Sequence, residues 1–326
     1  MNPTLTSLSG LLVGHFTHPI RPTGCTVVLC PQGAVAGVDV RGAAPGTRET
    51  DLLAPGNTVP HVHALLLSGG SAFGLDAAGG VMRWLEERDH GLKVGPACVP
   101  IVPAAVIFDL GVGDHRVKPD ASCGYAACEN ASADPVRGGN VGAGSGATVG
   151  KVHGPERAMK GGVGNALIKV GPWQVGALVV CNAMGDVVDP ESGVVIAGAR
   201  TSATSLEMLN IQKALLQGKS PTAPVIGAHT TIGVVACNAK LDKAQAARLA
   251  TAGHDGLART IRPVHTPMDG DTLFGLATGT CTDQPDPMLL CAMAAEAVAQ
   301  ATLNAVRSAK GLRLGERWWP AANDRG

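Results

Sequence analysis

The sequence contains few aromatic residues and has no excess of charge of either sign. Phe, Trp and Tyr together make up 3% of the 326 residues, whereas 44 residues are glycine. A hydrophobic core in such a chain must be built from Ala, Val and Leu, with backbones brought close together at glycines. Lys and Arg number 26, as do Asp and Glu, and neither sign occurs in blocks. This balance argues against a nucleic-acid-binding surface and against an anionic membrane as partner.

We also expect no targeting segment, and the sequence contains no long apolar span and no paired-cysteine motif. No basic residue precedes Arg21, so the start of the chain does not resemble a signal peptide. The longest apolar runs, such as 99–108, are short and interrupted by proline. The nine cysteines are odd in number, scattered, and without a C-x-x-C pair. We therefore expect reduced thiols, no bound metal and a cytoplasmic location.

Hydrophobic periodicity predicts strands and helices along the whole chain, without an interdomain linker. Two hairpins are expected at 25–41 and 161–189, a strand, glycine turn and helix at 63–91, helices at 204–216, 241–261 and 286–310, and strands beginning near 230 and 271. We expect Asp242 to be the N-cap of the helix at 241–261. Helices flanking such strands favour a mixed, mainly antiparallel sheet sandwich that is covered by helices. We expect a single domain over residues 1–326.

Two glycine-rich segments suggest functional motifs that they do not complete. Residues 142–147, "GAGSGA", match a loose dinucleotide fingerprint, but no strand is predicted before them. The overlapping segment resembles a phosphate-binding loop, except that Ser145 replaces the first glycine and Val152 replaces the magnesium-binding hydroxyl residue. Residues 68–74, "SGGSAFG", would place Ser71 on a nucleophile elbow, but Gly74 comes one residue late. A structural turn is the favoured interpretation of both segments.

A third segment places two hydroxyls at the head of a predicted core strand. It reads "GAHTTIGVVACNAK" at 227–240 and follows a linker-like stretch, "QGKSPTAPVI", at 217–226. A hydroxyl nucleophile can use its own α-amine as the base when its residue is a chain terminus. In mid-chain this is possible only if the chain cuts itself just before that residue. Since Thr is common in strands, the pattern alone favours an ordinary strand that begins Thr-Thr.

Six segments, spread over nearly the whole chain, carry a resemblance to a known family: "VRGAAPGTRETDLL", "HALLLSGGSAFGLDAAGGVMRWLEE", "GNVGAGSGATVGK", "VGALVVCNAMGDVVDP", "TTIGVVACNAKL" and "DGDTLFGLATG". In these segments and in their order the chain resembles the DmpA-type self-processing peptidases, which include β-aminopeptidases, L-aminopeptidase/D-esterases and nylon-oligomer hydrolases. The resemblance implies an α+β fold, an αββα sandwich like that of the N-terminal-nucleophile hydrolases but with different connectivity. It also implies an inactive precursor that cleaves itself.

The resemblance identifies Thr230 as the nucleophile, with Thr231 behind it, and the bond between His229 and Thr230 as the cleavage site. Cleavage would give a large chain, 1–229, and a small chain, 230–326. The family often has Asn or Gly before the cut, so His229 is a departure. We expect it to matter little, because this residue contributes mainly its carbonyl group.

Four further residues match positions of the family's active site. Asn182 matches the asparagine that stabilises the oxyanion, for which an amide N–H is suited. Asp269 and Asp271 match carboxylates of the nylon-oligomer hydrolases, and their i, i+2 spacing puts both on one side, where they can orient and charge-match an α-amine. Lys151 matches a lysine of the same hydrolases. Taken without the resemblance, these residues equally suit a turn-capping Asn, a solvated turn and a surface lysine.

The segment "VIFDL" departs from the aminopeptidases of the family. They carry a Glu and a Tyr where this chain has Val106 and Phe108 in the expected substrate pocket. Both polar groups are lost, which predicts a nylon-oligomer-hydrolase-like enzyme that cleaves small amides or peptides without a cofactor. The alternative is an aminopeptidase or β-peptidyl aminopeptidase that releases small N-terminal residues. A processed protein that only binds its ligand, or a small-molecule carrier, is the alternative from another class. The family also predicts a homo-oligomer of processed chains.

Overall fold

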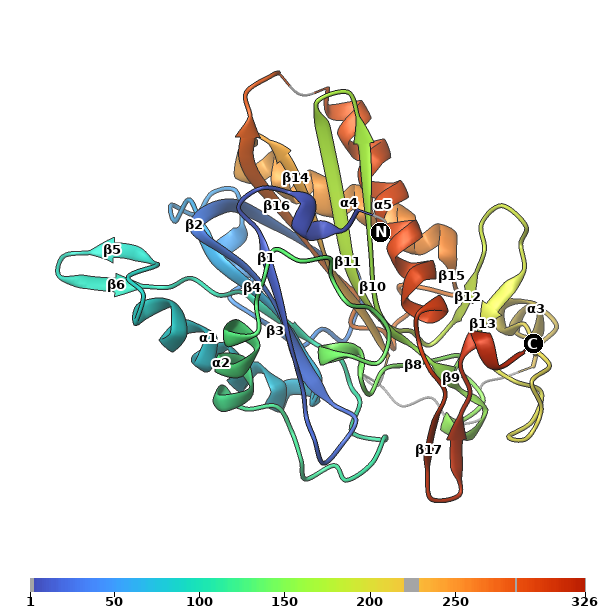
Figure 1. Ribbon diagram of the computed structural model, residues 1–326. Coiled ribbons are helices and arrows are strands. Elements are labelled where there is room, and N and C mark those ends of the chain that lie inside the picture. The colour runs from blue at the N-terminus through green and yellow to red at the C-terminus, as the bar shows by residue number, and fades with distance from the viewer. Residues whose placement is uncertain (1–2, 220–228, 285, 326) are drawn as a thin grey trace.

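The computed structural model of the chain describes residues 3–219, 229–284 and 286–325 (Figure 1). In this part of the chain nine strands are hydrogen-bonded in the order β10-β11-β14-β16-β2-β4-β7-β3, with β1 beside β2. Their bounds are β1 Leu12–Thr17, β2 Gly24–Val40, β3 Thr47–Arg48, β4 Val62–Ser68, β7 Ala104–Val106, β10 Gly162–Val170, β11 Trp173–Asn182, β14 Thr230–Ala239 and β16 Thr272–Cys281. The four longer helices are α1 Ala77–Glu86, α2 Ala121–Glu129, α4 Lys243–Thr260 and α5 Pro287–Arg307.

Strand β2 connects two halves of this sheet. Its first part pairs with β1 and β4, and its last part, from Val35, pairs with β16. The register against β4 shifts between Leu29 and Ala34, where the segment "PQG" lies. The hairpin predicted at 25–41 is therefore wrong: the two apolar runs are parts of one irregular strand because each finds its partners in a different half of the sheet.

Three buried clusters of side chains separate four layers of backbone. Because successive side chains of a strand point to opposite faces, neighbouring residues of one strand belong to different clusters. Leu65 of β4 and Val234 of β14 lie in the core between the two sheet halves. Leu66 faces the opposite way, with residues of α1 and α2, and Val235 faces α4 and α5. The order is helices, sheet, sheet, helices, which is the predicted αββα arrangement (Figure 1).

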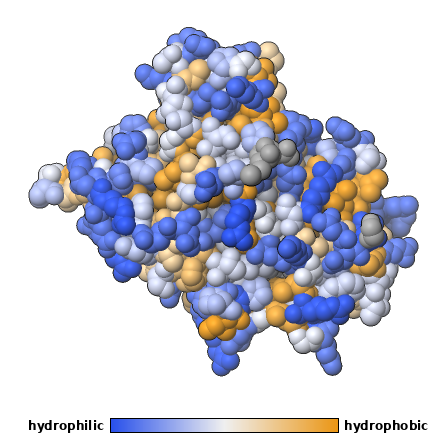
Figure 2. Space-filling model, viewed as in Figure 1, coloured by the Kyte–Doolittle hydropathy of each residue, from blue (hydrophilic) through white to orange (hydrophobic). Residues whose placement is uncertain are grey.

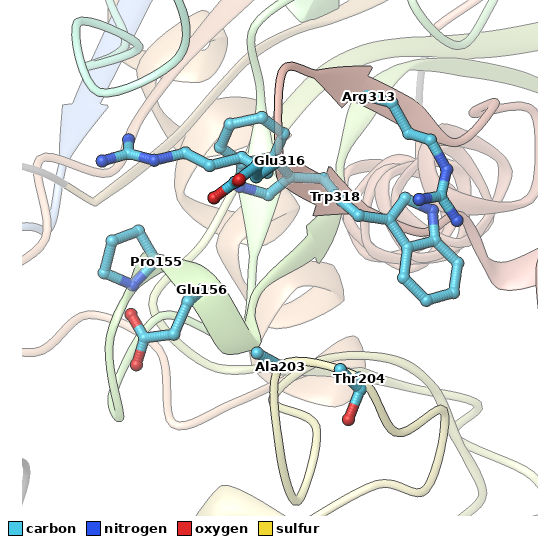
Figure 3. A pocket seen from close by; sticks show the side chains of 9 residues that line it. Pro155, Glu156, Ala203, Thr204, Arg313, Glu316 and Trp318 are labelled. Carbon is cyan, nitrogen blue, oxygen red and sulfur yellow. The ribbon is translucent and has the colours of Figure 1, made fainter.

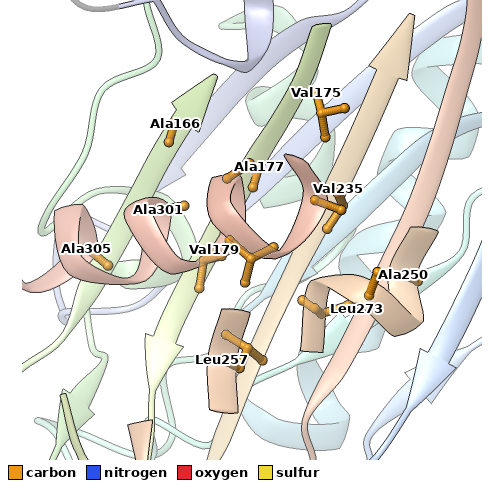
Figure 4. Packing of buried hydrophobic residues seen from close by; sticks show 14 of the residues in the cluster. Ala166, Val175, Ala177, Val179, Val235, Ala250, Leu257, Leu273, Ala301 and Ala305 are labelled. Carbon is orange, nitrogen blue, oxygen red and sulfur yellow. The ribbon is translucent and has the colours of Figure 1, made fainter. Parts of the chain in front are cut away.

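The core under α5 is built from small side chains, as the composition predicted. Ala301 and Ala305 of α5 lie over Ala166 and Ala177 of β10 and β11 (Figure 4). A Cβ atom at Gly164 would lie 2.0 Å from the Ala301 carbonyl oxygen, so only glycine permits this close approach. Helix α5 is apolar and long enough to cross a bilayer by length and composition alone, but 61% of its most apolar window is buried inside the molecule, as in a core helix.

Strands β14 and β16 run parallel, joined by α4 as the crossover helix. Asp242 caps α4 in a reciprocal capping box with Gln245, as the sequence predicted for this N-cap. Because the two strands are parallel, their first residues lie at the same edge of the sheet. The expectation of a mainly antiparallel sheet holds for the other long strand pairs but not for β14 with β16 or β4 with β7.

The remaining elements are short. They are α3 Ile211–Leu216, β5 Leu92–Val94, β6 Ala97–Val99, β8 Thr148–Val149, β9 Met159–Lys160, β12 Asp186–Val188, β13 Val195–Ala197, β15 Ile261–Arg262, β17 Leu312–Leu314 and β18 Arg317–Trp319. Helix α3 is shorter than the helix predicted at 204–216, and most of the predicted linker at 217–226 lies outside the described residues. All nine cysteines are described, and none of them forms a disulfide. Polar and apolar side chains are interspersed on the visible face (Figure 2).

Candidate active site

The predicted nucleophile lies opposite the predicted oxyanion residue. In the antiparallel pair of β11 and β14, Thr230 is the direct partner of Asn182, and both side chains are buried. Val180, two residues before Asn182, and Ile232, two residues after Thr230, belong to the core between the sheets. Thr230 and Asn182 therefore face the space between the two sheet halves, whereas Thr231 faces the layer of α4 and α5.

The peptide bond before Thr230 has two donors on its carbonyl oxygen. The Thr230 hydroxyl donates to the His229 carbonyl oxygen over 2.5 Å, and the backbone N–H of Gly270 donates to the same oxygen over 2.9 Å. This is the geometry of the uncut chain. It arises because His229 and Asp269 form a parallel bridge, so that the residues before β14 and β16 lie side by side.

The side-chain amide of Asn182 is oriented by its contacts. Its Oδ1 accepts from the backbone N–H of Thr148 over 3.0 Å and from Lys151 Nζ over 2.9 Å. Lys151 Nζ also donates to the Asn182 carbonyl oxygen over 2.8 Å. Two donors at Oδ1 leave Nδ2 as the donating end of the amide, and it reaches the Phe108 carbonyl oxygen over 3.2 Å.

Lys151 belongs to this group and is not a surface lysine. Although the residue as a whole is half-buried, its ammonium group lies against Asn182. Loss of hydration lowers the pKa of Lys151 to about 7, and the negative charge of Asp269 partly opposes this shift. The amine can therefore change its charge close to neutral pH.

The two aspartates lie beside the start of β14 but have different surroundings. Asp271 Oδ1 accepts from the backbone N–H of Thr231 over 2.6 Å, and Oδ2 accepts from His265 through the backbone N–H at 3.1 Å and the ring Nδ1 at 2.9 Å. Asp269 Oδ2 accepts from the backbone N–H of Thr266 over 2.8 Å. Burial, followed by the neighbouring charge of Asp271, raises the pKa of Asp269 to about 6.

The segment predicted to line the substrate pocket leads to the same site. Val106 is buried at the end of β7, and its backbone N–H donates to the Gly46 carbonyl oxygen over 3.0 Å. Phe108 is half-buried, and its carbonyl oxygen contacts the Asn182 amide. The carboxylate of Asp109 faces away, to Arg21 at 2.7 Å and the Thr23 hydroxyl at 2.6 Å. Asp109 is thus used by a buried ion pair.

The glycine-rich loop supports the site. Its residue Thr148 holds Asn182, and its carbonyl groups at Ser145 and Ala147 accept from Lys160 Nζ over 2.9 and 2.6 Å. Lys160 is fully buried, and the loss of hydration lowers its pKa to about 7. This use of the loop agrees with the interpretation of "GAGSGA" as a structural turn.

Sequence reasoning missed three residues of this site: Lys160, His265 and Gly270. Gly270 is the glycine between the two aspartates of "DGD", but a sequence does not indicate which backbone N–H groups will donate to a reacting bond. The histidine in "HTPMDGD" stands six residues before Asp271 and could have been noticed. Nothing local to Lys160 indicates that its ammonium group is buried.

A cavity of about 280 Å³ lies elsewhere, between the β17–β18 hairpin and the segments around 155 and 204. Trp318, Arg313 and Glu316 face Pro155 and Ala203 across it (Figure 3). None of the predicted site residues lines this cavity. Among the described residues, no three His, Cys, Asp or Glu side chains are grouped so that they could hold a metal ion.

Comparison with known proteins agrees with the predicted family. Residues 3–316 match peptidase family S58. An uncharacterized aminopeptidase of Mycobacterium tuberculosis is 47% identical over 310 residues, which are 90% of this chain and 86% of the relative. A 6-aminohexanoate-oligomer endohydrolase of Paenarthrobacter ureafaciens is 34% identical over 273 residues, which are 82% of this chain and 73% of that enzyme.

Solved structures agree with the predicted fold. The L-aminopeptidase D-Ala-esterase/amidase of Ochrobactrum anthropi, described as a variant of the Ntn-hydrolase fold, superposes with a TM-score of 0.74 at 20% identity, over 98% of this chain and 91% of its own. A β-aminopeptidase of a Burkholderia species gives a TM-score of 0.71 at 21% identity, over 98% and 90%. The chain therefore belongs to peptidase family S58, the DmpA family, and is a hydrolase of peptide or amide bonds.

Proposed function

We propose that the chain cleaves itself between His229 and Thr230 and then uses Thr230 as an N-terminal nucleophile. The observation that carries this proposal is the pair of donors on the His229 carbonyl oxygen, the Thr230 hydroxyl at 2.5 Å and the Gly270 N–H at 2.9 Å. A hydroxyl beside the carbonyl can attack its carbon, and an N–H aimed at its oxygen stabilises the charge that develops there.

The self-cleavage proceeds through an ester. A bond forms between Thr230 Oγ1 and the His229 carbonyl carbon while the peptide C–N bond breaks. The hydroxyl proton passes to the Thr230 nitrogen, which leaves as an amine. Water then hydrolyses the ester, which restores the hydroxyl and leaves a carboxylate on His229. Asp269 and Lys151, with pKa values of about 6 and 7, are suited to move this proton near neutral pH.

In turnover the freed α-amine of Thr230 takes the hydroxyl proton as Oγ1 attacks the substrate carbonyl. The carboxylates of Asp269 and Asp271 orient this amine and balance its charge when it is protonated. Asn182 Nδ2 donates to the oxyanion, since its Oδ1 is already held by Thr148 and Lys151. Water activated by the same amine releases the acyl group. The processed chains 1–229 and 230–326 stay together in this proposal, and we expect them to form a homo-oligomer.

We propose that the enzyme is an aminopeptidase. Its substrates would be small peptides or amides, from which it releases the N-terminal residue. The identity of 47% to proteins named as aminopeptidases, against 34% to the oligomer endohydrolases, favours this over the amine-independent hydrolase that "VIFDL" predicted. The amine-independent enzyme is the second candidate. It is supported by the buried Val106, which cannot pair with an ammonium group, and by Asp109, which is paired with Arg21.

A pair of matched substrates separates the two candidates. Fully processed enzyme would be given an amino-acid anilide and its N-acetylated counterpart, with Thr230→Ala protein as the control. An aminopeptidase should lose at least about 100-fold in kcat/KM on acetylation, as expected when a charged anchor loses its partner. Comparable rates would overturn the aminopeptidase assignment in favour of the second candidate. No release of aniline from either substrate would show that neither candidate describes the acyl group correctly.

A further inference from the structure

His265 makes two contacts with one carboxylate oxygen behind the nucleophile. Its backbone N–H and its ring Nδ1 both donate to Asp271 Oδ2, at 3.1 and 2.9 Å. The side chain is 16% exposed, and that of Asp271 is 2% exposed. A hydrogen bond to a buried carboxylate is among the stronger interactions of a protein interior, because one partner is charged.

The backbone at His265 is held in the left-handed region, with φ at +56°. A residue with a Cβ atom is disfavoured in this conformation, although histidine adopts it more often than most residues. Such a conformation persists where the surroundings require it. At His265 this conformation allows the backbone N–H and the ring Nδ1 to donate to the same oxygen of Asp271.

The other oxygen of Asp271 reaches the nucleophile strand. Oδ1 accepts from the Thr231 N–H over 2.6 Å, one residue after Thr230. His265, Asp271 and Thr231 therefore form a continuous chain of hydrogen bonds that ends beside the reacting residue. Among the described residues, the Asp269 carboxylate accepts hydrogen bonds from Thr266 alone, whereas the Asp271 carboxylate accepts from three donors on Thr231 and His265. The two aspartates, equivalent in the sequence, are not equivalent in the fold.

We propose that His265 is a positioning residue for the reaction at Thr230, which fixes the Asp271 carboxylate on the nucleophile strand and so directs proton uptake by the acidic pair to Asp269. This inference rests on the proposed function, because His265 can affect the reaction only if Thr230 is the nucleophile. Hydrogen bonds to the ionised form of a carboxylate favour that form, and two adjacent carboxylates disfavour double ionisation. An unequal distribution of donors therefore decides which of the two takes the proton.

The groups around His265 and Asp271 are consistent with this assignment. The ring of His254, from α4, lies 4.8 Å from that of His265, and its Nε2 donates to the Asp39 carbonyl oxygen of β2 over 2.9 Å. Burial lowers the pKa of His254 to about 4, so that this neighbour is neutral. The thiol of Cys181 on β11 is also neutral, since burial raises its pKa to about 12.

Two positively charged side chains also lie nearby. Arg41, whose backbone N–H donates to the Asp271 carbonyl oxygen, contributes an exposed guanidinium. On the other side the positive charge of Lys151 lowers the pKa of Asp269, an effect smaller than the rise caused by burial and by the charge of Asp271.

Two substitutions at this position separate the donor from the backbone conformation. Glycine and asparagine both tolerate the left-handed region, so neither should disturb the loop. His265→Gly removes the ring donor. His265→Asn retains an N–H close to the place of Nδ1. Each variant would be made in the Thr230→Ala precursor, and the side-chain carboxyl carbons of Asp269 and Asp271 would be titrated by NMR.

We expect Asp269 to take the proton first in the parent protein and in His265→Asn. In His265→Gly both carboxyl carbons should respond over the same pH range, because the pair then shares the proton. Identical titrations in all three proteins would overturn the proposal, as would His265→Asn behaving like His265→Gly. This readout needs no activity, so failure of the wild-type chain to cut itself would count against the proposed function alone.

Discussion

The backbone N–H of Gly270 donates to the carbonyl oxygen of His229, on the peptide bond that precedes Thr230. The contact joins two segments 41 positions apart in the chain, and it follows from the parallel pairing of β14 and β16. A Cβ atom at Gly270 would lie 2.6 Å from the Ala44 carbonyl oxygen and 3.0 Å from Thr230 Oγ1. Glycine is therefore the residue that lets a main-chain donor approach this bond.

Self-cleavage should yield two fragments, residues 1–229 and 230–326, the smaller beginning Thr-Thr-Ile-Gly. A denaturing gel and the mass of each fragment test this. Thr230→Ala should abolish cleavage, because it removes the attacking hydroxyl. Thr231→Ala is the matched control and should still be cut, since Thr231 faces the helix layer. An intact chain after long incubation at neutral pH would contradict the assignment, and equal loss from both variants would point to a folding defect.

Asn182→Asp should lower kcat by about 10²–10³, the usual effect of losing one oxyanion donor. The aspartate keeps an oxygen for the Thr148 N–H and for Lys151, so the site should stay assembled while the Nδ2 donor is lost. Asn182→Ala removes both functions and serves for comparison. Steady-state kinetics on processed enzyme provide the measurement, and a kcat within threefold of the wild type for Asn182→Asp would exclude the amide as the oxyanion donor.

The rate of self-cleavage should rise with pH through about 6, where Asp269 loses its proton. Below this pH the carboxyl is neutral and cannot accept the Thr230 proton. Asp269→Asn should remove this limb and slow cleavage by about 10²-fold or more, the lower range for a lost general base. Following freshly refolded precursor by gel from pH 5 to 8 gives both profiles. An unchanged limb in Asp269→Asn would assign it to another group, with Lys151 next to be tested.

The same shift predicts how the stability of the precursor depends on pH. Because the folded pKa of Asp269 lies above its ordinary value of 3.8, the folded chain binds this proton more tightly than the unfolded chain. The contribution of Asp269 to the free energy of unfolding should therefore fall as pH rises from about 4 to 6. Urea denaturation of Thr230→Ala, with and without Asp269→Asn, should show a weaker pH dependence in the double variant. Parallel curves would contradict the shift.

Two neighbouring glycines of α1 should respond in opposite directions to alanine. A Cβ atom at Gly80 would lie 1.7 Å from the Ala121 carbonyl oxygen, whereas one at Gly79 meets nothing within 4 Å. Gly80→Ala should therefore destabilise by about 1–3 kcal/mol through overpacking against α2. Gly79→Ala should stabilise by about 0.4–1 kcal/mol, because it restricts the unfolded chain without a clash. Denaturant unfolding of both variants tests this, and a loss of stability in both would mean that α1 tolerates no added side chain.

By itself the sequence determined the family and the layers of the fold, and it identified candidate residues for the site. Apolar runs marked β11, β14 and β16, and the capping residue Asp242 marked α4, because these signals are local. The "TT" and "DGD" segments indicated a site only through the family resemblance. The segment "VIFDL" did not decide whether the enzyme requires a free amine on its substrate. The loss of two polar groups does not identify what replaces them.

Only the tertiary structure decided how these residues meet. It showed that 24–40 is one strand shared by two sheet halves, since pairing partners distant in sequence cannot be read from a local pattern. It also brought the Gly270 N–H to the His229 carbonyl and distinguished Asp271 from Asp269 by the donors of His265. Hydrogen bonding and burial depend on which segments lie side by side, and the parallel pairing of β14 with β16 sets that here.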